Sequence, residues 1–468
     1  MTAPLLDSAE LESLLGEAVN EAASARHKRV VSVSQQIDCA DPVAVVFASR
    51  RASEPWFCWQ QPDREFALAA LGTAHSVVSH GRDRFRDVAA ECAHLSGEAV
   101  LRGPGGSGDR TGPTWSGGFS FSESGPAGSA WSPFAPAAMT LPEVSFEADH
   151  GRTLMTVNAL VQSGADEAGL VGRLVRRVNG LVSADLGMID PHPAQKSSIE
   201  SIRSPEAFED SVAAAVERIR SGEIEKVVLA REVLVRSSAA HDPAAIFAAL
   251  REGFPSCFNF CVGTPEAAFI GASPELLVRC VGRGVSTVGL AGSTRRSSDP
   301  AVDDHLAQKL LNSPKDRSEQ DLVVQRIVKA LSRLSVWVEA GEEPEIIKVA
   351  NIQHLGTPVI AHLLEPRTAI ELAGLLHPTP AVGGEPWKKA ERVMEEVEQM
   401  ERGWYAAPVG WMDGSGDGEF CVALRSALLR DREAHLYAGV GVVADSDPAS
   451  ELAETEIKLG AMLPLLGG

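Results

Sequence analysis

Two carboxylates and a lysine near the end of the chain have a spacing that could do chemistry. Glu451, Glu454 and Lys458 stand at positions i, i+3 and i+7 of ASELAETEIKLGAML, so a helix would carry all three on one face. The ordinary interpretation is a solvated stripe with an ion pair between Glu454 and Lys458, because such surface pairs are common. Gly439 and Gly441 in the preceding run YAGVGVV favour a site, since they allow close backbone approach to a substrate carboxylate.

A third carboxylate falls where the pattern predicts an apolar side chain. The helix expected in SPKDRSEQDLVVQRIVKAL has an apolar stripe formed by Val323, Ile327, Ala330 and Leu334. Glu319 lies on that stripe, where a carboxylate needs a partner. One explanation is a salt bridge with Arg326 or with a lysine of another helix. The other is an all-oxygen metal site shared with Glu451 and Glu454, and oxygen ligands without a His or Cys cluster suit magnesium better than zinc.

Four further polar residues stand in apolar segments. They are Lys226 at the start of KVVLAREVLV, Glu275 in GASPELL, His354 in NIQHLGTPV and Arg425 in VALR. Lys226 could be a strand-end charge, and Glu275 a first-turn residue of a helix that starts after the Ser-Pro pair. His354 could be a hydrogen-bonded core residue and Arg425 an interior ion-pair partner. Periodicity alone does not show whether these positions meet.

The residues from Ser204 onward are expected to form helices that alternate with strands rich in β-branched residues, and these elements must position the residues above. A helix is expected from Ser204-Pro205 to Ser221-Gly222, and a strand follows at Lys226. PVGWMDGSGDGEFCVALRSALL predicts two strands joined by a Gly-Asp turn, which favours a mixed or antiparallel sheet. The turn looks like a calcium loop, but Leu424 at its twelfth position cannot supply the closing carboxylate.

Composition limits the classes of function. The 468 residues include 63 acidic and 43 basic ones, and the net charge of -20 argues against nucleic acid or an anionic membrane as a partner. An anionic substrate would then need a cation or a few placed Arg and Lys. Seven cysteines without a C-x-x-C pair suit a reducing cytosol. No leader pattern is seen in MTAPLLDSAELESLLGEAV, and no run reaches about 18 apolar residues, so we expect a cytoplasmic protein.

Eight ordered segments resemble the signature motifs of the chorismate-utilising enzymes, the family of anthranilate synthase component I. The segments are KVVLAR, GASPELL, GLAGSTRR, KDRSEQDLVV, NIQHLGTPV, HPTPAVGG, GEFCVALR and SELAETEIK. The resemblance covers about Ser204 to Leu465. The first 200 residues resemble the longer, menaquinone-type isochorismate synthases, for example in WQQPDREFALAALG at Trp59 and WSGGFSF at Trp115.

The resemblance implies a fold and an activity. The fold is α/β (α+β), with a large stacked, mostly antiparallel sheet core wrapped by helices. Residues 1–200 would form an amino-terminal part integrated into the same fold as a catalytic region at 201–468. The activity would be magnesium-dependent conversion of chorismate to isochorismate, as a monomer without an obligatory protein partner.

The resemblance also implies roles for single residues. Lys226 would be the general base that deprotonates the water attacking C2, and Glu275 the general acid that protonates the departing C4 hydroxyl. The implied magnesium ligands are Glu319 and Glu454, with Glu451 directly or through water. The implied substrate-binding residues are Ala291, His354, Tyr405, Arg425, Gly439, Gly441 and Lys458. Among them Arg425 and Tyr405, with the Gly439 to Gly441 backbone, would hold the enolpyruvyl carboxylate.

Three positions depart from the family pattern. Gln320 stands where the family usually has His, and Ala406-Ala407-Pro408 replaces a more glycine-rich turn. Ala291 occupies the position of a lysine in many aminodeoxychorismate synthases, which argues against a covalent lysine route. The alternatives are a salicylate synthase or a siderophore-pathway isochorismate synthase. Anthranilate synthase component I and a non-catalytic anion-binding relative rank lower.

Overall fold

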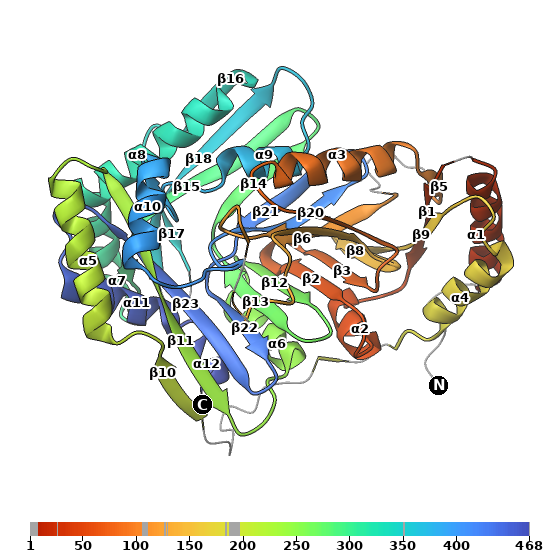
Figure 1. The fold of residues 1–468 in the computed structure, drawn as a ribbon, viewed down its shortest axis with the longest axis horizontal. Coiled ribbons are helices and arrows are strands. Elements are labelled where there is room, and N and C mark those ends of the chain that lie inside the picture. Colours follow the sequence, from red (N-terminus) through yellow and green to blue (C-terminus); the bar gives the residue numbers. More distant parts are fainter. Residues whose placement is uncertain are drawn as a thin grey trace.

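Two stacked β-sheets form the centre of the molecule, with helices on their outer faces and at their ends (Figure 1). The computed structural model describes residues 8–25, 27–104, 111–125, 128, 130–182, 185–186, 197–349 and 352–467. Within these ranges the larger sheet has 13 strands and the smaller sheet 10. Every pairing in the same ranges is antiparallel except the parallel pairing of β1 with β5. The predicted fold class is confirmed.

The larger sheet contains strands from both the start and the end of the expected catalytic region. Its strands lie in the order β10 (Ser197–Ser201), β11 (Lys226–Ser237), β23 (Glu433–Val442), β22 (Ser426–Arg430), β13 (Ala268–Ser273), β12 (Phe258–Gly263), β2 (Trp56–Gln61), β3 (Phe66–Leu71), β8 (Val144–Asp149), β9 (Arg152–Val161), β1 (Arg29–Ile37) and β5 (Val100–Arg102). The short β19 (Gly384–Glu385) pairs with β11.

The smaller sheet lies against one face of the larger. Its strands lie in the order β16 (Ser335–Ala340), β18 (Ile352–Leu363), β15 (Gly284–Arg295), β14 (Leu276–Val281), β21 (Gly418–Val422), β20 (Pro408–Asp413), β6 (Thr114–Phe119), β7 (Ala137–Leu141) and β4 (His75–Ser79). The short β17 (Glu345–Lys348) pairs with β18.

The helices cover the sheets and add to their cores. Those that contact the smaller sheet are α3 (Arg84–Gly97), α7 (Pro300–Leu311), α8 (Pro314–Leu331) and α9 (Ala369–Leu376). Those that contact the larger sheet are α1 (Ser8–Ala23), α2 (Pro42–Ser49), α5 (Pro205–Arg220), α6 (Pro243–Gly253), α10 (Trp387–Val397) and α11 (Pro448–Leu459). Helix α4 (Glu167–Asn179) packs on α1, and α12 (Leu463–Leu466) packs on α6.

Both sheets combine strands from the two halves of the chain. In the larger sheet β2 pairs with β12, with Trp59 opposite Phe260. In the smaller sheet β6 pairs with β20, with Gly117 opposite Gly410. The expectation that residues 1–200 form an amino-terminal part integrated into the same fold as residues 201–468 stays a prediction.

Most of the local predictions from the second half are confirmed. Helix α5 starts after Ser204, whose side chain accepts a hydrogen bond from the amide of Ala207. Strands β20 and β21 form the expected hairpin, and Asp413 closes its turn by accepting from the amides of Ser415 and Asp417. Helix α11 ends at Leu459, earlier than the segment ASELAETEIKLGAML suggested.

A helix after Ser273 was the wrong alternative for Glu275. Strand β13 ends at Ser273 and β14 begins at Leu276, so a two-residue link carries the chain from the larger sheet to the smaller. The link of residues 423–425 returns the chain from β21 to β22 in the larger sheet. The two links run side by side, since the amide of Val422 donates to the carbonyl of Glu275 and the amide of Ala272 donates to the carbonyl of Arg425.

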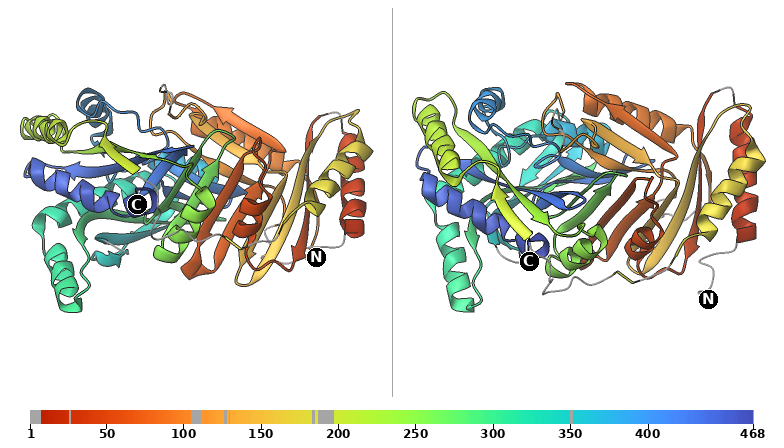
Figure 2. Two further views of the ribbon diagram at one scale, coloured as in Figure 1. Left: turned by 90° about the horizontal axis from the view of Figure 1, so that it is seen from below. Right: turned by 60° about the horizontal axis from the view of Figure 1, so that its bottom comes forward.

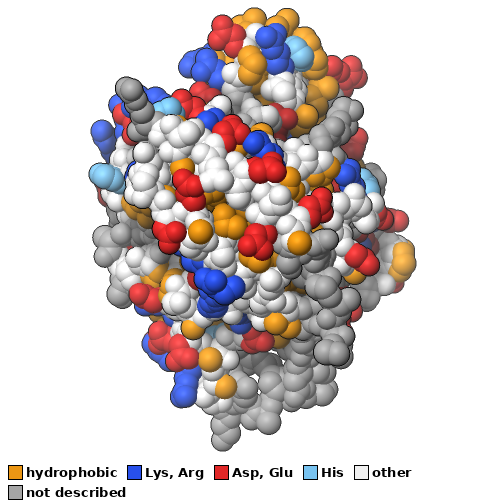
Figure 3. All heavy atoms as spheres, turned by 90° about the vertical axis from the view of Figure 1, so that its right-hand side faces the viewer, with side chains coloured by type: hydrophobic (Ala, Val, Ile, Leu, Met, Phe, Trp, Pro, Cys, Tyr) orange, Lys and Arg blue, Asp and Glu red, His pale blue; other side chains and the backbone are white. Residues whose placement is uncertain are grey.

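The molecule is elongated along its sheets. Helices α1 and α4 lie at one end, and α5 and α8 lie at the other (Figure 2). On the face that carries α1 and α4, acidic and basic side chains are interspersed and apolar side chains are scattered (Figure 3). None of the helices in the described ranges has the length and apolar character needed to cross a bilayer.

Candidate active site

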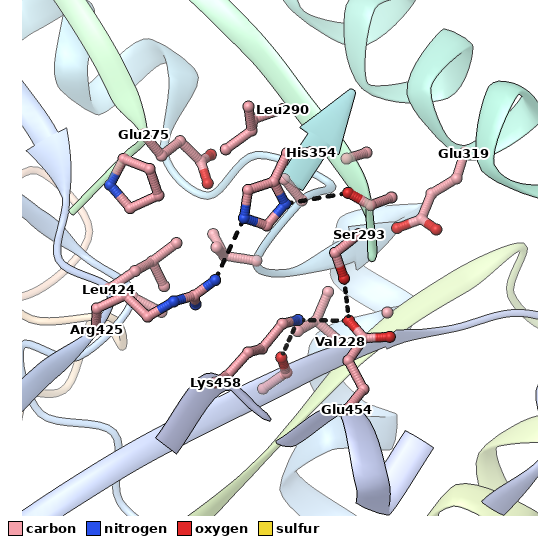
Figure 4. A pocket seen from close by; sticks show the side chains of 18 of the residues that line it. Val228, Glu275, Leu290, Ser293, Glu319, His354, Leu424, Arg425, Glu454 and Lys458 are labelled. Carbon is pink, nitrogen blue, oxygen red and sulfur yellow. Dashed lines mark hydrogen bonds and ion pairs between the residues drawn. The ribbon is translucent and has the colours of Figure 1, made fainter. Parts of the chain in front are cut away.

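One cavity between the two sheets gathers nearly all the residues that the sequence selected. The predicted residues that line it are Glu275, Ala291, Glu319, His354, Tyr405, Arg425, Gly439, Gly441, Glu451, Glu454 and Lys458. In Figure 4, Glu275 and His354 lie on one side of this space and Glu454 and Lys458 on the opposite side. Lys226 stands behind the lining and reaches the cavity through its contact with Glu319.

Lys226 is a buried lysine. It is the first residue of β11, its side chain is 2% exposed, and its Nζ lies 2.6 Å from Oε1 of Glu319 on α8. The strand-end charge was therefore the wrong alternative. The neighbouring strand accommodates the pair through Gly441, where a Cβ atom would lie 2.7 Å from Oε1 of Glu319 and 3.1 Å from Cε of Lys226. The pairing of Glu319 is with a strand lysine, whereas Arg326 pairs with Glu385.

Glu275 lies in the link between the sheets and is 4% exposed. Its amide donates to Oγ of Ser273, and its carbonyl accepts from Val422, so the backbone at this position is held at both ends. Burial raises the pKa of its carboxyl to about 8, against the opposing charges of Lys226 and Arg425. The carboxyl is therefore protonated at neutral pH and can give up a proton to a leaving group.

Arg425 is a buried cation without a carboxylate partner among the described residues. Its Nη2 lies 3.3 Å from Nε2 of His354, and its Nε is buried without a hydrogen-bond partner. Burial lowers the pKa of this guanidinium. An interior ion pair was thus the wrong alternative, and a group of this kind in a cavity needs an anion to compensate it.

His354 is both a buried, hydrogen-bonded residue and part of the cavity wall. Its Nδ1 lies 3.1 Å from the carbonyl oxygen of Gly292, which can only accept, so we assign the proton to Nδ1. Burial, followed by the charges of Arg425 and Lys458, lowers the pKa of His354 to about 3. The ring is neutral and presents Nε2 to Arg425.

Glu454 and Lys458 form the expected pair on α11, but inside the cavity rather than on a solvated stripe. Nζ of Lys458 lies 2.7 Å from Oε1 of Glu454 and donates to the carbonyl of Gly439 at 2.8 Å. The hydroxyl of Ser293 donates to the same carboxylate. Burial raises the pKa of Glu454, yet Lys458 and Ser293 outweigh it and hold the value at about 2. Ser293 had no distinguishing signal beyond its place in GLAGSTRR.

The first turn of α8 contributes two charged residues that the sequence prediction missed. Nζ of Lys315 lies 3.4 Å from Oε1 of Glu451, and Asp316 lines the cavity beside it. Burial raises the pKa of Glu451 and that of Asp316. The only sequence signal for Lys315 and Asp316 was their membership of the KDR segment that leads to Glu319.

Gln320 holds α8 against the smaller sheet. Its Nε2 donates to the carbonyl of Gly289 on β15 at 2.7 Å and to Oγ1 of Thr357 on β18 at 2.9 Å. The side chain is buried, whereas the adjacent Glu319 faces the cavity. The residue that departs from the family pattern therefore anchors the helix turn that carries Glu319.

The Ala406-Ala407-Pro408 turn keeps a glycine-like backbone without glycine. Ala406 has φ of 59°, in the left-handed region that favours glycine, and its amide donates to the carbonyl of Ala423. Tyr405 before it is buried, and its ring stacks on Tyr437 with centroids 5.1 Å apart. The turn thus places Tyr405 at the cavity despite the alanines.

Arg402 is a further cavity residue that had no recognisable signal in the sequence. It forms a buried ion pair of 2.6 Å with Glu398, and its guanidinium donates to the carbonyls of Val228 and Val382 at 2.8 Å each. Glu398 in turn accepts from the amide of Ala230. This pair ties the strand of Lys226 to the HPTPAVGG segment, because both backbones share one guanidinium.

The donor chemistry of the cavity fits a hard cation. Beside the protonated carboxyl of Glu275, it has the acidic side chains of Asp316, Glu319, Glu451 and Glu454. Carboxylate oxygens are the ligands that magnesium prefers in proteins. Among the described residues, however, no three His, Cys, Asp or Glu side chains lie close enough together to share one ion as they stand. Glu319, Glu451 and Glu454 are each held by a lysine instead.

The model of the family described as chorismate binding enzyme matches residues 17–467. The chain belongs to the chorismate binding enzymes. The family predicted from the motifs is confirmed, and the match includes the first 200 residues as well as the motif region. A member of this family is expected to bring its motifs together in one place, and the cavity between the sheets is where they meet.

Several relatives of this chorismate binding enzyme carry the name isochorismate synthase. One from Pseudomonas aeruginosa, named salicylate biosynthesis isochorismate synthase, is 36% identical over 98% of this chain and 95% of its own length. Isochorismate synthase MenF of Bacillus subtilis is 32% identical over 96% of each chain. The solved structure of the menaquinone-specific isochorismate synthase MenF from Escherichia coli has a TM-score of 0.77, covers 98% of this chain and all of its own, and at 24% identity shows the shared fold.

Proposed function

We propose that the protein is an isochorismate synthase, an isomerase that converts chorismate to isochorismate. The observation that carries the proposal is a pair of buried groups: a carboxyl at Glu275 that is protonated at neutral pH, and the lysine Lys226, which contacts Glu319 of the cavity wall. An acid and a base are what an exchange of hydroxyl groups needs, because hydroxide leaves poorly without a proton and water attacks poorly without a base. The names of the full-length relatives support the same reaction.

In this reaction water forms a bond to C2 of the ring, the ring π electrons shift, and the C4–O bond breaks. Lys226 acts in this step as the free amine and takes the proton of the attacking water. Glu275 gives its proton to the departing hydroxyl, which leaves as water. A proton returned from Lys226 to Glu275 through solvent restores both groups. Glu275 begins the cycle correctly protonated, since its pKa of about 8 lies above neutral pH.

The charged groups of the cavity provide for a substrate with two carboxylates. Arg425 would receive the enolpyruvyl carboxylate through parallel N–H donors, and His354 keeps its guanidinium oriented. Glu319, Glu454 and Glu451 would hold magnesium, which supplies positive charge for the ring carboxylate. A dianion entering with a dication adds no net charge, which suits a protein of formal charge -20.

The destination of the product is a separate proposal. We propose menaquinone supply, which the similarity to MenF of Bacillus subtilis along the full chain supports. Expression in a bacterium that lacks its menaquinone isochorismate synthase tests it, because restored menaquinone would be expected. Complementation only of a strain that lacks its salicylate or siderophore isochorismate synthase would overturn the assignment. This second strain is needed because the relative from Pseudomonas aeruginosa is named for salicylate biosynthesis.

Chromatography of the products formed from chorismate tests the activity. Isochorismate is expected with magnesium and its loss is expected with a chelator. Salicylate as the main product, anthranilate in the presence of ammonia, or no turnover would reject the proposal. Lys226→Met and Glu275→Gln should fold and lose activity by about two to four orders of magnitude. Lys329→Met is the matched control, since Lys329 is an exposed lysine on α8.

A further inference from the structure

Each glutamate expected to hold magnesium is paired with a different lysine. The pairs are Lys226 with Glu319 at 2.6 Å, Lys458 with Glu454 at 2.7 Å and Lys315 with Glu451 at 3.4 Å. The three lysines come from β11, α11 and α8, so no single element arranges them. In the protein without metal and substrate, three separate segments of the chain thus supply an ammonium group to neutralise the carboxylates that would bind the dication.

The lysines differ in how easily their ammonium groups can leave. The side chains of Lys226 and Lys458 are 2% and 13% exposed, whereas that of Lys315 is 42% exposed. A lysine ammonium is a hydrated point charge on a flexible stem, so Lys315 can turn to solvent without leaving a buried, unpaired charge. Lys226 and Lys458 are more enclosed, so moving either ammonium group away from its carboxylate costs more than moving that of Lys315.

The carboxylate of Glu451, unlike the ammonium group of Lys315, is buried. It is 6% exposed, so its negative charge would destabilise the fold without a cation beside it. Magnesium requires nearly ideal octahedral geometry, and an ammonium group on a ligating carboxylate opposes its binding by charge repulsion.

We propose that Lys315 competes with magnesium for Glu451. In the metal-free protein its ammonium group neutralises Glu451, and it moves to solvent when the dication binds. Lys315 is therefore a residue that sets the affinity for metal, not a ligand and not a catalytic residue. The inference rests on the magnesium dependence proposed above, and it adds the exchange of cations at one named carboxylate.

Calorimetric titration with magnesium chloride tests the competition without any turnover. Lys315→Met keeps the length of the side chain and removes its charge. We expect it to bind magnesium about threefold more tightly than the wild type, as the loss of a partly exposed competing pair predicts. Lys329→Met removes the same charge at an exposed position of the same helix and should match the wild type. The metal-free Lys315→Met variant should also melt at a lower temperature than Lys329→Met, because its buried Glu451 has lost the neighbouring cation.

A double-mutant cycle separates competition from a general change of charge in the cavity. In a Glu451→Gln background there is no carboxylate for Lys315 to occupy, so Lys315→Met should no longer tighten binding. Equal tightening in both backgrounds, no change, or weaker binding in Lys315→Met would overturn the inference while leaving the proposed activity intact. The metal dependence itself is tested by two further magnesium titrations, one of the wild type and one of Glu275→Gln with chorismate present, which does not turn over. If neither protein binds magnesium, the metal dependence is overturned as well.

Discussion

The guanidinium of Arg425 donates to Nε2 of His354 over 3.3 Å, so the imidazole acts on this cation as a neutral acceptor. Its other nitrogen is occupied by the carbonyl of Gly292. Burial, with Arg425 next in size, lowers the pKa of His354 to about 3. A ring that is neutral throughout the working range orients Arg425 and does not exchange protons with the substrate.

Replacement of His354 should therefore affect binding more than the chemical step. His354→Phe is expected to raise KM for chorismate by about tenfold with a smaller change in kcat, because Arg425 loses its acceptor. The folded pKa lies below the ordinary 6.5, so the wild type loses stability as pH falls from about 6.5 toward 3, and the variant should lose less. Steady-state kinetics and denaturant titrations across that range measure both effects, and an unchanged KM would contradict the role.

Arg425→Met should separate stability from function. Removal of a buried charge that has no carboxylate partner among the described residues is expected to raise the melting temperature of the free protein. The same change should weaken chorismate binding by about two orders of magnitude, since it removes the anion's partner. Thermal melts without ligand and KM for chorismate are the two measurements. A lower melting temperature would show that Arg425 is compensated in the free protein.

Glu275→Gln tests the protonated carboxyl. Because the folded pKa of about 8 lies above the ordinary 4.5, the contribution of Glu275 to stability is full below about pH 4.5 and is lost as pH rises toward 8. The glutamine variant lacks this loss, so it should gain stability over the wild type with rising pH. The wild-type rate should fall on the alkaline side as Glu275 loses its proton. Parallel stability curves for the two proteins would remove the assignment of an acid at this position.

Gly441→Ala should disturb the ion pair of Lys226 and Glu319 by steric contact alone. A Cβ at this position would lie 2.7 Å from Oε1 of Glu319, so that side chain must move. We expect the magnesium concentration for half-maximal activity to rise about tenfold, because an expected ligand is displaced. Gly253→Ala on α6 is the control, since a Cβ there meets nothing within 4 Å. A magnesium requirement that does not change would mean that Glu319 is not held by this contact.

The sequence was informative wherever a residue type and its local pattern carried the signal. Short segments predicted α5, β11, the β20 and β21 hairpin and helix α11, because caps, turns and apolar periods are local properties. The resemblance of the motifs selected Glu275 and Arg425, which periodicity alone left with ordinary explanations. Their place in the links between the sheets became visible only in the structure.

Long-range partners could not be read from the chain. Lys226 and Glu319 are 93 positions apart, and nothing in either segment indicates the other. Gln320 stood out in the sequence only as a departure from the family pattern, because its bonds to Gly289 and Thr357 depend on how α8 lies on the sheet. Arg402 and Lys315 were missed for the same reason, because a lone charge in a helix or loop acquires a role only from tertiary packing.

The links that carry Glu275 and Arg425 are also the places where the chain passes from one sheet to the other. Glu275 and Arg425 therefore lie where the two sheets are connected, and the distance between their side chains depends on how tightly the two sheets pack. Turnover should therefore report on that packing. In a denaturant titration, activity is expected to disappear before the circular dichroism of the strands and helices, because a slight parting of the layers moves these two side chains while each sheet keeps its own hydrogen bonds.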